Sequence, residues 1–391
     1  MLGLGSTESN DGQTDVGDRG ATEPMDNRGG LAVYVTSHGF GHLNRVVSVL
    51  NRIPAEIPMV IRSAADLFVN WRERLERPAR LEDQTWDSGA VNPLGASSVT
   101  DGRATIERAL ASHTRLYPQI EQEAARLKAE GTAAVLCDVP PMPLAAAARA
   151  GISGFALANF TWSEIYAEHA AGMGAEAQAL VREIEALYGQ ATASFRAEPA
   201  LPMRELPNQI PVGLVVSKGR ERRAELRARL GLTEQDKLVY FYVGRYGQED
   251  LAWHRLASFQ GIHFVSFHEA AVGPLPNLHV VPASEWRGAD LMTSCDAAVA
   301  KAGYGTVSDA MAAQTPLIFP PRENFAEHAA LEAALLRWGG GYVVDERRFA
   351  AFEIAEELAQ AFSGRPGPPP FPVDGAQRIA DRLVQEIRAR T

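Results

Sequence analysis

The sequence has few cysteines, no long apolar run and no excess of positive charge, and each shortage excludes a class of protein. Its only cysteines, Cys137 and Cys295, end apolar runs and belong to no CxxC or Cys/His set. We therefore expect neither a zinc site nor a disulfide framework, and we predict that both thiols are buried and reduced. No window approaches the roughly 18 consecutive apolar residues of a membrane-spanning helix, and the N-terminus has no basic-then-apolar signal pattern. The protein is expected to be soluble and cytoplasmic.

Other absences narrow the chemistry. The formal net charge is −10, with no concentrated basic patch, which argues against a nucleic-acid partner. No Asp-x-Asp pair follows a strand where a metal would bridge a diphosphate, so no metal and no cofactor are predicted. A serine-centred elbow, a Walker lysine loop and a kinase glycine-rich loop are also missing.

The composition that remains fits two α/β domains, because 391 residues with 46% hydrophobic content suffice for two separate cores. Strands alternate with helices of ten residues or more, which predicts doubly wound, mostly parallel sheets. The predicted organisation is a disordered tail (1–29), a first domain (30–198), a proline-containing linker (199–213), a second domain (214–365) and a terminal segment (366–391) whose helix packs back on the first domain.

Each half has its own series of predicted strands, placed by apolar runs between helical stretches and turns. The first half has Leu31–Val35, Met59–Arg62, Gln84–Asp87, Ala133–Asp138 and Gly154–Ala158. The second has Leu238–Val243, His263–Phe267, His279–Val281, Ala297–Ala300 and Leu317–Phe319.

The turn Ser37–His42 lies between the first strand and a helix, where an open parallel sheet forms its ligand crevice. Gly39 and Gly41 allow close approach of the backbone to a ligand, and His42 is placed to act as a base. The turn departs from the GxGxxG fingerprint and no acidic ribose partner is evident, which disfavours a dehydrogenase. The alternative is a tight strand-to-helix connection with solvent-facing histidines.

A more specific pattern runs from Asp296 to Met311, as a strand, a glycine loop and a helix. Thr306 and Ser308 are predicted to cap this helix and, with its free N–H groups, to hold a diphosphate, while Asp309 reaches a ribose. Glu323 and Asn324, in a later loop, suit bidentate recognition of sugar hydroxyls. The alternative is an ordinary strand-helix-strand unit with polar loops. The predicted donor residues are Gly41, Gly244, Arg245, Lys301, Gly303, Gly305, Thr306, Asp309, Glu323 and Asn324, and Arg322 is a further available cation.

Polar residues at other strand ends are candidates for the acceptor side. Asp87 and Asp138 each end an apolar strand, where they can orient His42 or an acceptor hydroxyl, or equally cap a turn. The run from Asn159 to Trp162 combines amide, hydroxyl and aromatic groups that suit carbohydrate, although a core plug is as good an interpretation. The predicted catalytic residues are His42 and Asp138, and the predicted acceptor residues are His38, Asp87, Asn159 and Trp162.

The run from Lys301 to Met311, followed by Pro-Leu-Ile-Phe-Pro-Pro-Arg-Glu-Asn, resembles the donor motif of GT-B glycosyltransferases. That motif is usually His-Gly-Gly-x-Gly-Thr-x-x-Glu and then Asp-Gln. Lys301 stands for the usual histidine, Asp309 for the glutamate and Glu323-Asn324 for the Asp-Gln pair. Residues 31–350 also resemble the glycosyltransferase-like N-terminal region of plant L-arabinokinases and its stand-alone bacterial relatives.

The resemblance implies a GT-B fold, two Rossmann-like domains facing across a crevice. It implies no kinase activity, because the kinase domain that follows this region in arabinokinases has no counterpart here. Lys301 either strengthens contact with a diphosphate or indicates a donor other than a uridine nucleotide.

The residues favour inverting, metal-independent transfer from a nucleoside-diphosphate sugar to a small-molecule acceptor, with His42 as the general base. A nucleotide-sugar epimerase or hydrolase of the same fold and a noncatalytic nucleotide-sugar sensor are the alternatives. The acceptor, the donor base and sugar, and the oligomeric state stay open.

Overall fold

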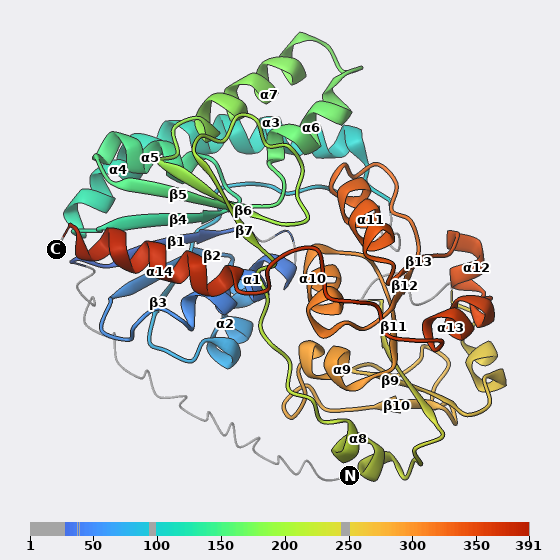
Figure 1. Ribbon diagram of the computed structural model, residues 1–391. Helices are drawn as coiled ribbons and strands as arrows, with labels where there is room; N and C mark the ends of the chain where they lie inside the picture. Colours follow the sequence, from blue (N-terminus) through green and yellow to red (C-terminus); the bar gives the residue numbers. More distant parts are fainter. Residues whose placement is uncertain (1–27, 37, 39, 94–98, 244–250, 391) are drawn as a thin grey trace, which may run out of the picture.

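The computed structural model describes residues 28–36, 38, 40–93, 99–243 and 251–390. Its strands form two all-parallel sheets, one in each half of the chain, with helices on both faces of each (Figure 1). The N-terminal sheet has the order β3-β2-β1-β4-β5-β6-β7 and the C-terminal sheet the order β10-β9-β8-β11-β12-β13. The predicted doubly wound α/β architecture is confirmed.

The N-terminal sheet and its helices are drawn from residues 31–213. Its strands are β1 (Leu31–Val35), β2 (Met59–Ser63), β3 (Arg80–Asp83), β4 (Ala134–Asp138), β5 (Ser153–Ala158), β6 (Ala193–Ala197) and β7 (Gln209–Gly213). Its helices are α1 (Phe40–Leu50), α2 (Phe68–Arg74), α3 (Gly102–Leu116), α4 (Ile120–Ala129), α5 (Met142–Ala150), α6 (Trp162–Ala170) and α7 (Ala175–Tyr188).

The C-terminal domain repeats the arrangement. Its strands are β8 (Lys237–Tyr242), β9 (Ile262–Ser266), β10 (Leu278–Val280), β11 (Ala297–Ala300), β12 (Leu317–Phe319) and β13 (Gly341–Val343). Its helices are α8 (Arg223–Leu230), α9 (Gly288–Ser294), α10 (Tyr304–Ala313), α11 (Glu327–Trp338), α12 (Glu346–Ala350) and α13 (Ala355–Ala361), and α14 (Gly375–Arg388) ends the chain.

The central strand β1 shows how the layers are held together. It is buried along its whole length, so it is apolar on both faces, as a covered parallel strand must be. Leu31 and Val33 belong to the hydrophobic cluster that includes α1 and α14. Ala32 and Tyr34 point to the opposite face and join the cluster built from α3, α4 and α5. The first cluster continues into the C-terminal domain through residues of β8 and α10, so the two domains share packed apolar surface.

The last helix crosses back to the first domain. α14 packs against α1, β4 and β7, and it buries Ile379, Leu383 and Ile387 (Figure 1). The Leu214 N–H donates to the Pro372 carbonyl over 2.8 Å, so the two chain crossings between the domains lie side by side. The chain therefore connects the two domains at two adjacent segments and not at one hinge.

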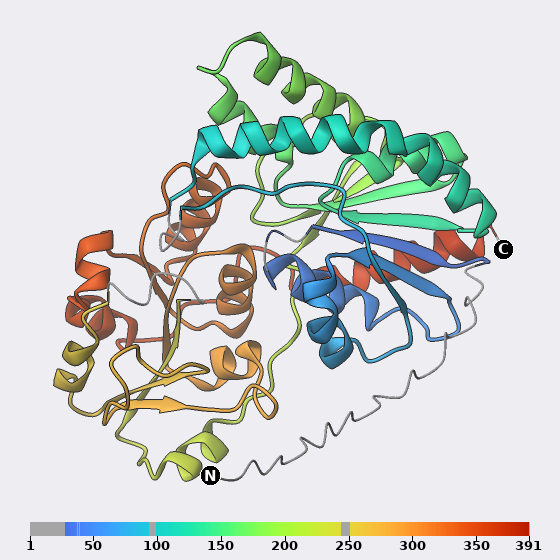
Figure 2. The ribbon, with the colours of Figure 1, turned by 180° about the vertical axis from the view of Figure 1, so that it is seen from behind.

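Two predictions about the chain path are wrong. Residues 209–213 of the predicted linker form β7, because their backbone pairs with β6 at the sheet edge. The predicted strand Gln84–Asp87 lies beyond β3, which pairs with β2 through residues 80–83 instead. Residues 84–93 then leave the sheet and run toward the C-terminal domain (Figure 2), where Val99 forms an isolated β-bridge with Glu323.

Two features of the chain match its composition. Cys137 and Cys295 are both buried and unpaired, as predicted. None of the helices within the described ranges has the length and apolar character of a membrane span. The predicted tail 1–29 lies outside the described residues apart from its end, where the Gly29 N–H donates to the Gly131 carbonyl over 2.9 Å.

Candidate active site

The candidate site lies where the strand order reverses in each sheet. This reversal falls between β1 and β4 in the first domain and between β8 and β11 in the second. Loops that leave neighbouring strands at such a point run in opposite directions and leave a crevice at the carboxyl ends of the strands. His38 follows β1, His42 lies in the first turn of α1, Asp138 ends β4, and Lys301 follows β11. Gly244 and Arg245, in the loop after β8, lie outside the described residues.

The N-terminal ends of α1 and α10 meet across this crevice. A Cβ placed on Gly305 would lie 3.8 Å from the Gly41 Cα atom, so the two glycines lie close together. The first helical hydrogen bond of α10 runs from the Val307 N–H to the Gly303 carbonyl over 3.0 Å. The N–H groups at positions 304, 305 and 306 therefore have no acceptor within the helix, and with the helix dipole they favour an anion.

His42 is hydrogen-bonded to Asp138. The Nδ1 atom lies 2.7 Å from the Asp138 Oδ1 atom, and the exposed fractions of the two side chains are 11% and 0%. Arg45 donates to both carboxylate oxygens, from Nε over 2.8 Å and from Nη2 over 2.6 Å. Burial by itself would raise the pKa of Asp138, but the charges of Arg45 and His42 and their hydrogen bonds outweigh it and lower the pKa.

An ionised carboxylate fixes the histidine tautomer. Because the Asp138 carboxylate only accepts hydrogen bonds, the neutral form of His42 carries its hydrogen on Nδ1 and has its lone pair on Nε2. The His42 ring also contacts Phe160 edge-on, with 5.6 Å between the ring centroids. The pair therefore has the arrangement of a general base held by a buried carboxylate.

The same network continues into the other domain. Arg45 donates from Nη1 to the Asn159 side-chain oxygen over 2.5 Å, and Asn159 donates to the Glu327 carboxylate over 2.7 Å. Glu327 begins α11 in the C-terminal domain and is 7% exposed. Arg45 also lies over the Tyr304 ring at the start of α10, 4.8 Å from its centroid. A continuous chain of contacts thus joins His42 to the domain that carries the predicted donor motif.

Sequence reasoning missed Arg45 and Glu327. Arg45 follows His42 by three positions, so the two residues share one face of α1, and this spacing was an available signal. No comparable signal marked Glu327, because its partner Asn159 is 168 positions away.

The run from Asp296 to Met311 forms the predicted strand, glycine loop and helix, with differences in detail. α10 begins at Tyr304 after Gly303, so Thr306 does not cap the helix as predicted but sits in its first turn, where its N–H has no acceptor within the helix. Ser308 does not cap the helix start, because its buried hydroxyl donates to the Tyr304 carbonyl within the helix over 2.6 Å. Burial raises the pKa of the Asp309 carboxyl to about 7, against an opposing effect of Arg287.

Lys301 follows β11, and Arg322 lies close enough for its charge to act on Lys301. Burial is the main cause that lowers the pKa of Lys301 to about 8, and the positive charge of Arg322 adds to it. Glu323 and Asn324 follow Arg322 and are both exposed. Asn324 adopts a left-handed backbone with φ of 57°, so the chain turns sharply just before α11.

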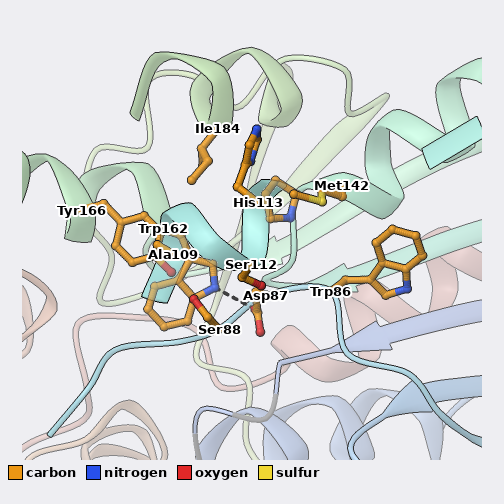
Figure 3. Close-up of a pocket in the computed structure, with 11 residues that line it drawn as sticks. Trp86, Asp87, Ser88, Ala109, Ser112, His113, Met142, Trp162, Tyr166 and Ile184 are labelled. Carbon is orange, nitrogen blue, oxygen red and sulfur yellow. Dashed lines mark hydrogen bonds between the residues drawn. The ribbon is translucent and has the colours of Figure 1, made fainter. Parts of the chain in front are cut away.

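The predicted acceptor residues Asp87 and Trp162 are brought together, but their polar groups bond to protein. Asp87 accepts from the Thr36 hydroxyl over 2.9 Å and from the Trp162 indole over 2.8 Å, the bond drawn in Figure 3. Burial raises the pKa of Asp87 to about 6, although these two hydrogen bonds oppose the shift. The cavity beside them, which Met142 and Tyr166 also line, measures about 20 Å³ and has room for about one water molecule.

His38 and Asn159 are likewise enclosed by protein. His38 accepts from the Ala90 N–H at Nδ1 over 3.2 Å and stacks on Phe325 with 5.9 Å between the ring centroids. Burial, with a contribution from Arg322, lowers the pKa of His38 to about 3. Asn159 is fully buried between Arg45 and Glu327. These side chains therefore build the wall of the crevice, and an acceptor would need other polar contacts.

No group of three or more His, Cys, Asp and Glu side chains suited to a metal ion occurs among the described residues. Any charge on a bound diphosphate would be met here by the N-terminus of α10 and by Lys301.

The chain is similar to a curated protein and to several solved structures. No protein-family model matches the chain. L-arabinokinase of Arabidopsis thaliana is 29% identical over 343 residues, which are 86% of this chain and 32% of the kinase. The chain thus spans about a third of the length of this curated relative. The resemblance to L-arabinokinases inferred from the sequence is confirmed.

Solved structures show the fold. CalG4, the calicheamicin glycosyltransferase, is 15% identical with a TM-score of 0.59, and the match covers 94% of this chain and 98% of CalG4. UGT2 of Phytolacca americana, complexed with UDP-2fluoro-glucose and pterostilbene, is 14% identical with a TM-score of 0.58 and covers 92% and 94%. The spinosyn rhamnosyltransferase SpnG, complexed with thymidine diphosphate, is 16% identical with a TM-score of 0.56 and covers 92% and 96%. The chain has the GT-B fold of these glycosyltransferases, as predicted.

Proposed function

We propose that the protein is an inverting, metal-independent glycosyltransferase that moves a sugar from a nucleoside-diphosphate sugar to a small-molecule acceptor. The observation that carries the proposal is the 2.7 Å hydrogen bond between His42 and buried Asp138, placed across the crevice from the N-terminus of α10. A base on one wall and an anion site on the other are the two components that such a transfer requires. The resemblance to structures complexed with nucleotides adds support.

In the proposed reaction the His42 Nε2 atom removes the proton from the acceptor nucleophile. The nucleophilic atom then bonds to the anomeric carbon, from the face opposite the diphosphate, so the configuration inverts. The bond between the anomeric carbon and the diphosphate oxygen breaks, and its electron pair leaves with the nucleoside diphosphate. The free N–H groups of α10 and the Lys301 ammonium meet the charge on the leaving group.

Replacing His42 by alanine tests the assignment. We expect transfer to fall by about 10²–10⁴-fold, the usual contribution of a general base, while binding of the nucleoside diphosphate is retained. Asp138→Asn should also slow transfer, because an amide no longer fixes the tautomer or stabilises the imidazolium that forms. His254→Ala is the matched control, since His254 is exposed in the C-terminal domain.

Calorimetry measures the binding of a panel of nucleoside diphosphates. A separate assay measures turnover with nucleotide sugars and candidate acceptors. Both are carried out with and without EDTA. Undiminished turnover in His42→Ala would exclude His42 as the base, and loss of turnover in EDTA would exclude metal independence. Donor consumed to an epimer or free sugar without any acceptor, followed by NMR, would instead identify an epimerase or hydrolase. Binding with no turnover of any kind would identify a sensor.

A further inference from the structure

Arg322 is a partly buried cation without a counter-ion in contact. Its Nε atom is buried and has no hydrogen-bond partner, and no carboxylate among the described residues lies within ion-pair distance of the guanidinium. The nearest acidic influence is Glu327, whose oxygen already accepts from Asn159. An unpaired charge in such a place is costly, because burial removes its hydration without replacing it. The guanidinium is therefore suited to a ligand that brings a negative charge.

The position of this guanidinium is fixed. Its central carbon lies 3.7 Å from the centroid of the Phe325 ring, which is a cation–π contact. Phe325 is 4% exposed and is anchored in the core cluster of the N-terminal domain, where it also meets Phe160 with 5.8 Å between centroids. A cation held in place in this way loses little conformational entropy when it binds a ligand.

Arg322 and Phe325 line a pocket of about 490 Å³ between α6 and α11. This volume falls in the range of small-molecule sites, unlike the cavity beside Asp87. Apolar groups from α11, among them Ala329 and Leu336, form much of its wall, and Glu168 lies on the α6 side. Asn324 also lines it, with Glu332, which pairs with His328 at 3.1 Å. The pocket therefore combines an apolar surface with the Arg322 cation at the β12–α11 loop and with the carboxylates of Glu168 and Glu332.

The pocket includes Arg322 and Asn324 from the second part of the predicted donor motif, but it does not reach the first part. None of the residues that line it belongs to the glycine loop after β11 or to α10. Two aromatic rings, those of Phe325 and Phe160, lie between the pocket and His42. Phe325 contacts Phe160, and Phe160 contacts the His42 ring. A molecule anchored at Arg322 must therefore extend past Phe325 to bring its nucleophile to His42.

We propose that Arg322 and this pocket bind the anionic group, a carboxylate or a phosphate, of the acceptor. The assignment rests on the proposed transferase function for the word acceptor, but the binding chemistry follows from the pocket itself. The protein would then select acceptors that carry a negative charge over neutral ones of the same shape.

The test measures dissociation constants of the full-length protein by ligand-observed NMR for benzoate, phenyl phosphate, neutral benzamide and UDP. We expect benzoate or phenyl phosphate to bind at least tenfold more tightly than benzamide. Arg322→Gln should abolish this preference, Arg322→Lys should retain part of it, and neither should change the UDP constant. Arg337→Gln is the control, because Arg337 lies on α11 outside the pocket lining and is exposed.

Each possible outcome either supports the anion site at Arg322 or overturns it. Equal binding of the anions and benzamide by the unaltered protein overturns the proposal without reference to any variant, so misfolding of Arg322→Gln cannot hide the answer. A parallel loss of UDP affinity in Arg322→Gln assigns the residue to the donor diphosphate and also overturns it. If no nucleotide binds but benzoate binding still depends on Arg322, the anion site stands and the transferase function fails.

Discussion

Replacing Glu327 by alanine should weaken the connection between the domains and slow the reaction at the same time. Glu327 is 7% exposed and accepts from the Asn159 amide over 2.7 Å. A hydrogen bond to a charged group contributes about 1.5–3 kcal/mol, and the alanine variant leaves a fully buried Asn159 amide without its partner. We therefore expect Glu327→Ala to cost about 2–3 kcal/mol.

Glu327→Gln should be milder. The glutamine oxygen can still accept from Asn159, but a neutral hydrogen bond is roughly half as strong, so the expected cost is about 1 kcal/mol. Glu353→Ala is the control, because the pair that Glu353 forms with Arg255 at 2.9 Å is exposed and such pairs are worth under about 1 kcal/mol.

Thermal unfolding followed by circular dichroism measures the stability of these variants. Tm should fall by roughly 5 °C in Glu327→Ala and about 2 °C in Glu327→Gln, at a few degrees per kcal/mol. In turnover, kcat should fall in Glu327→Ala with a smaller change in the donor KM, because the network ends at His42. Glutamine should recover part of kcat. The reasoning is refuted if Glu327→Ala has the Tm and kcat of Glu353→Ala.

Two further predictions concern the donor site and the crevice wall. The pKa of Lys301 is lowered to about 8, so its positive charge is present below that pH and is lost above it. The affinity for UDP, measured by calorimetry, should therefore fall as the pH rises from 7 to 9. This pH dependence should vanish in Lys301→Met but persist in the control variant Lys218→Met. Gly89 has φ of 65°, and a Cβ there would lie 2.7 Å from the His38 Nδ1 atom. Gly89→Ala should thus be destabilised by more than the roughly 1–2 kcal/mol of left-handed strain. Gly151→Ala, with φ of 71° and nothing within 4 Å of the added Cβ, isolates that strain, and equal urea midpoints for the two variants would contradict the proposed contact with His38.

The sequence by itself determined the fold class and the position of the glycine loop and helix at which we propose the anion site. Strands such as Leu31–Val35 are apolar at every position, a pattern typical of a sheet that is covered on both faces. The glycine loop before α10 is also visible as a short, local sequence pattern. Local signals of this kind survive without tertiary information. The sequence pattern placed His42 and Asp138 at strand ends, and sheets of this class bring such ends together.

Only the tertiary structure decided how those residues are used. Asp87 and Trp162 had the composition of a carbohydrate site, yet they bond to each other, because packing of α6 against the loop after β3 brings them within 2.8 Å. The hydrogen bond between Asn159 and Glu327 depends on how the two domains pack against each other, because the two residues are 168 positions apart in the sequence. Such contacts depend on how whole layers of helices and sheets pack together. The order of side chains along the sequence does not indicate which distant residue will lie next to a given one.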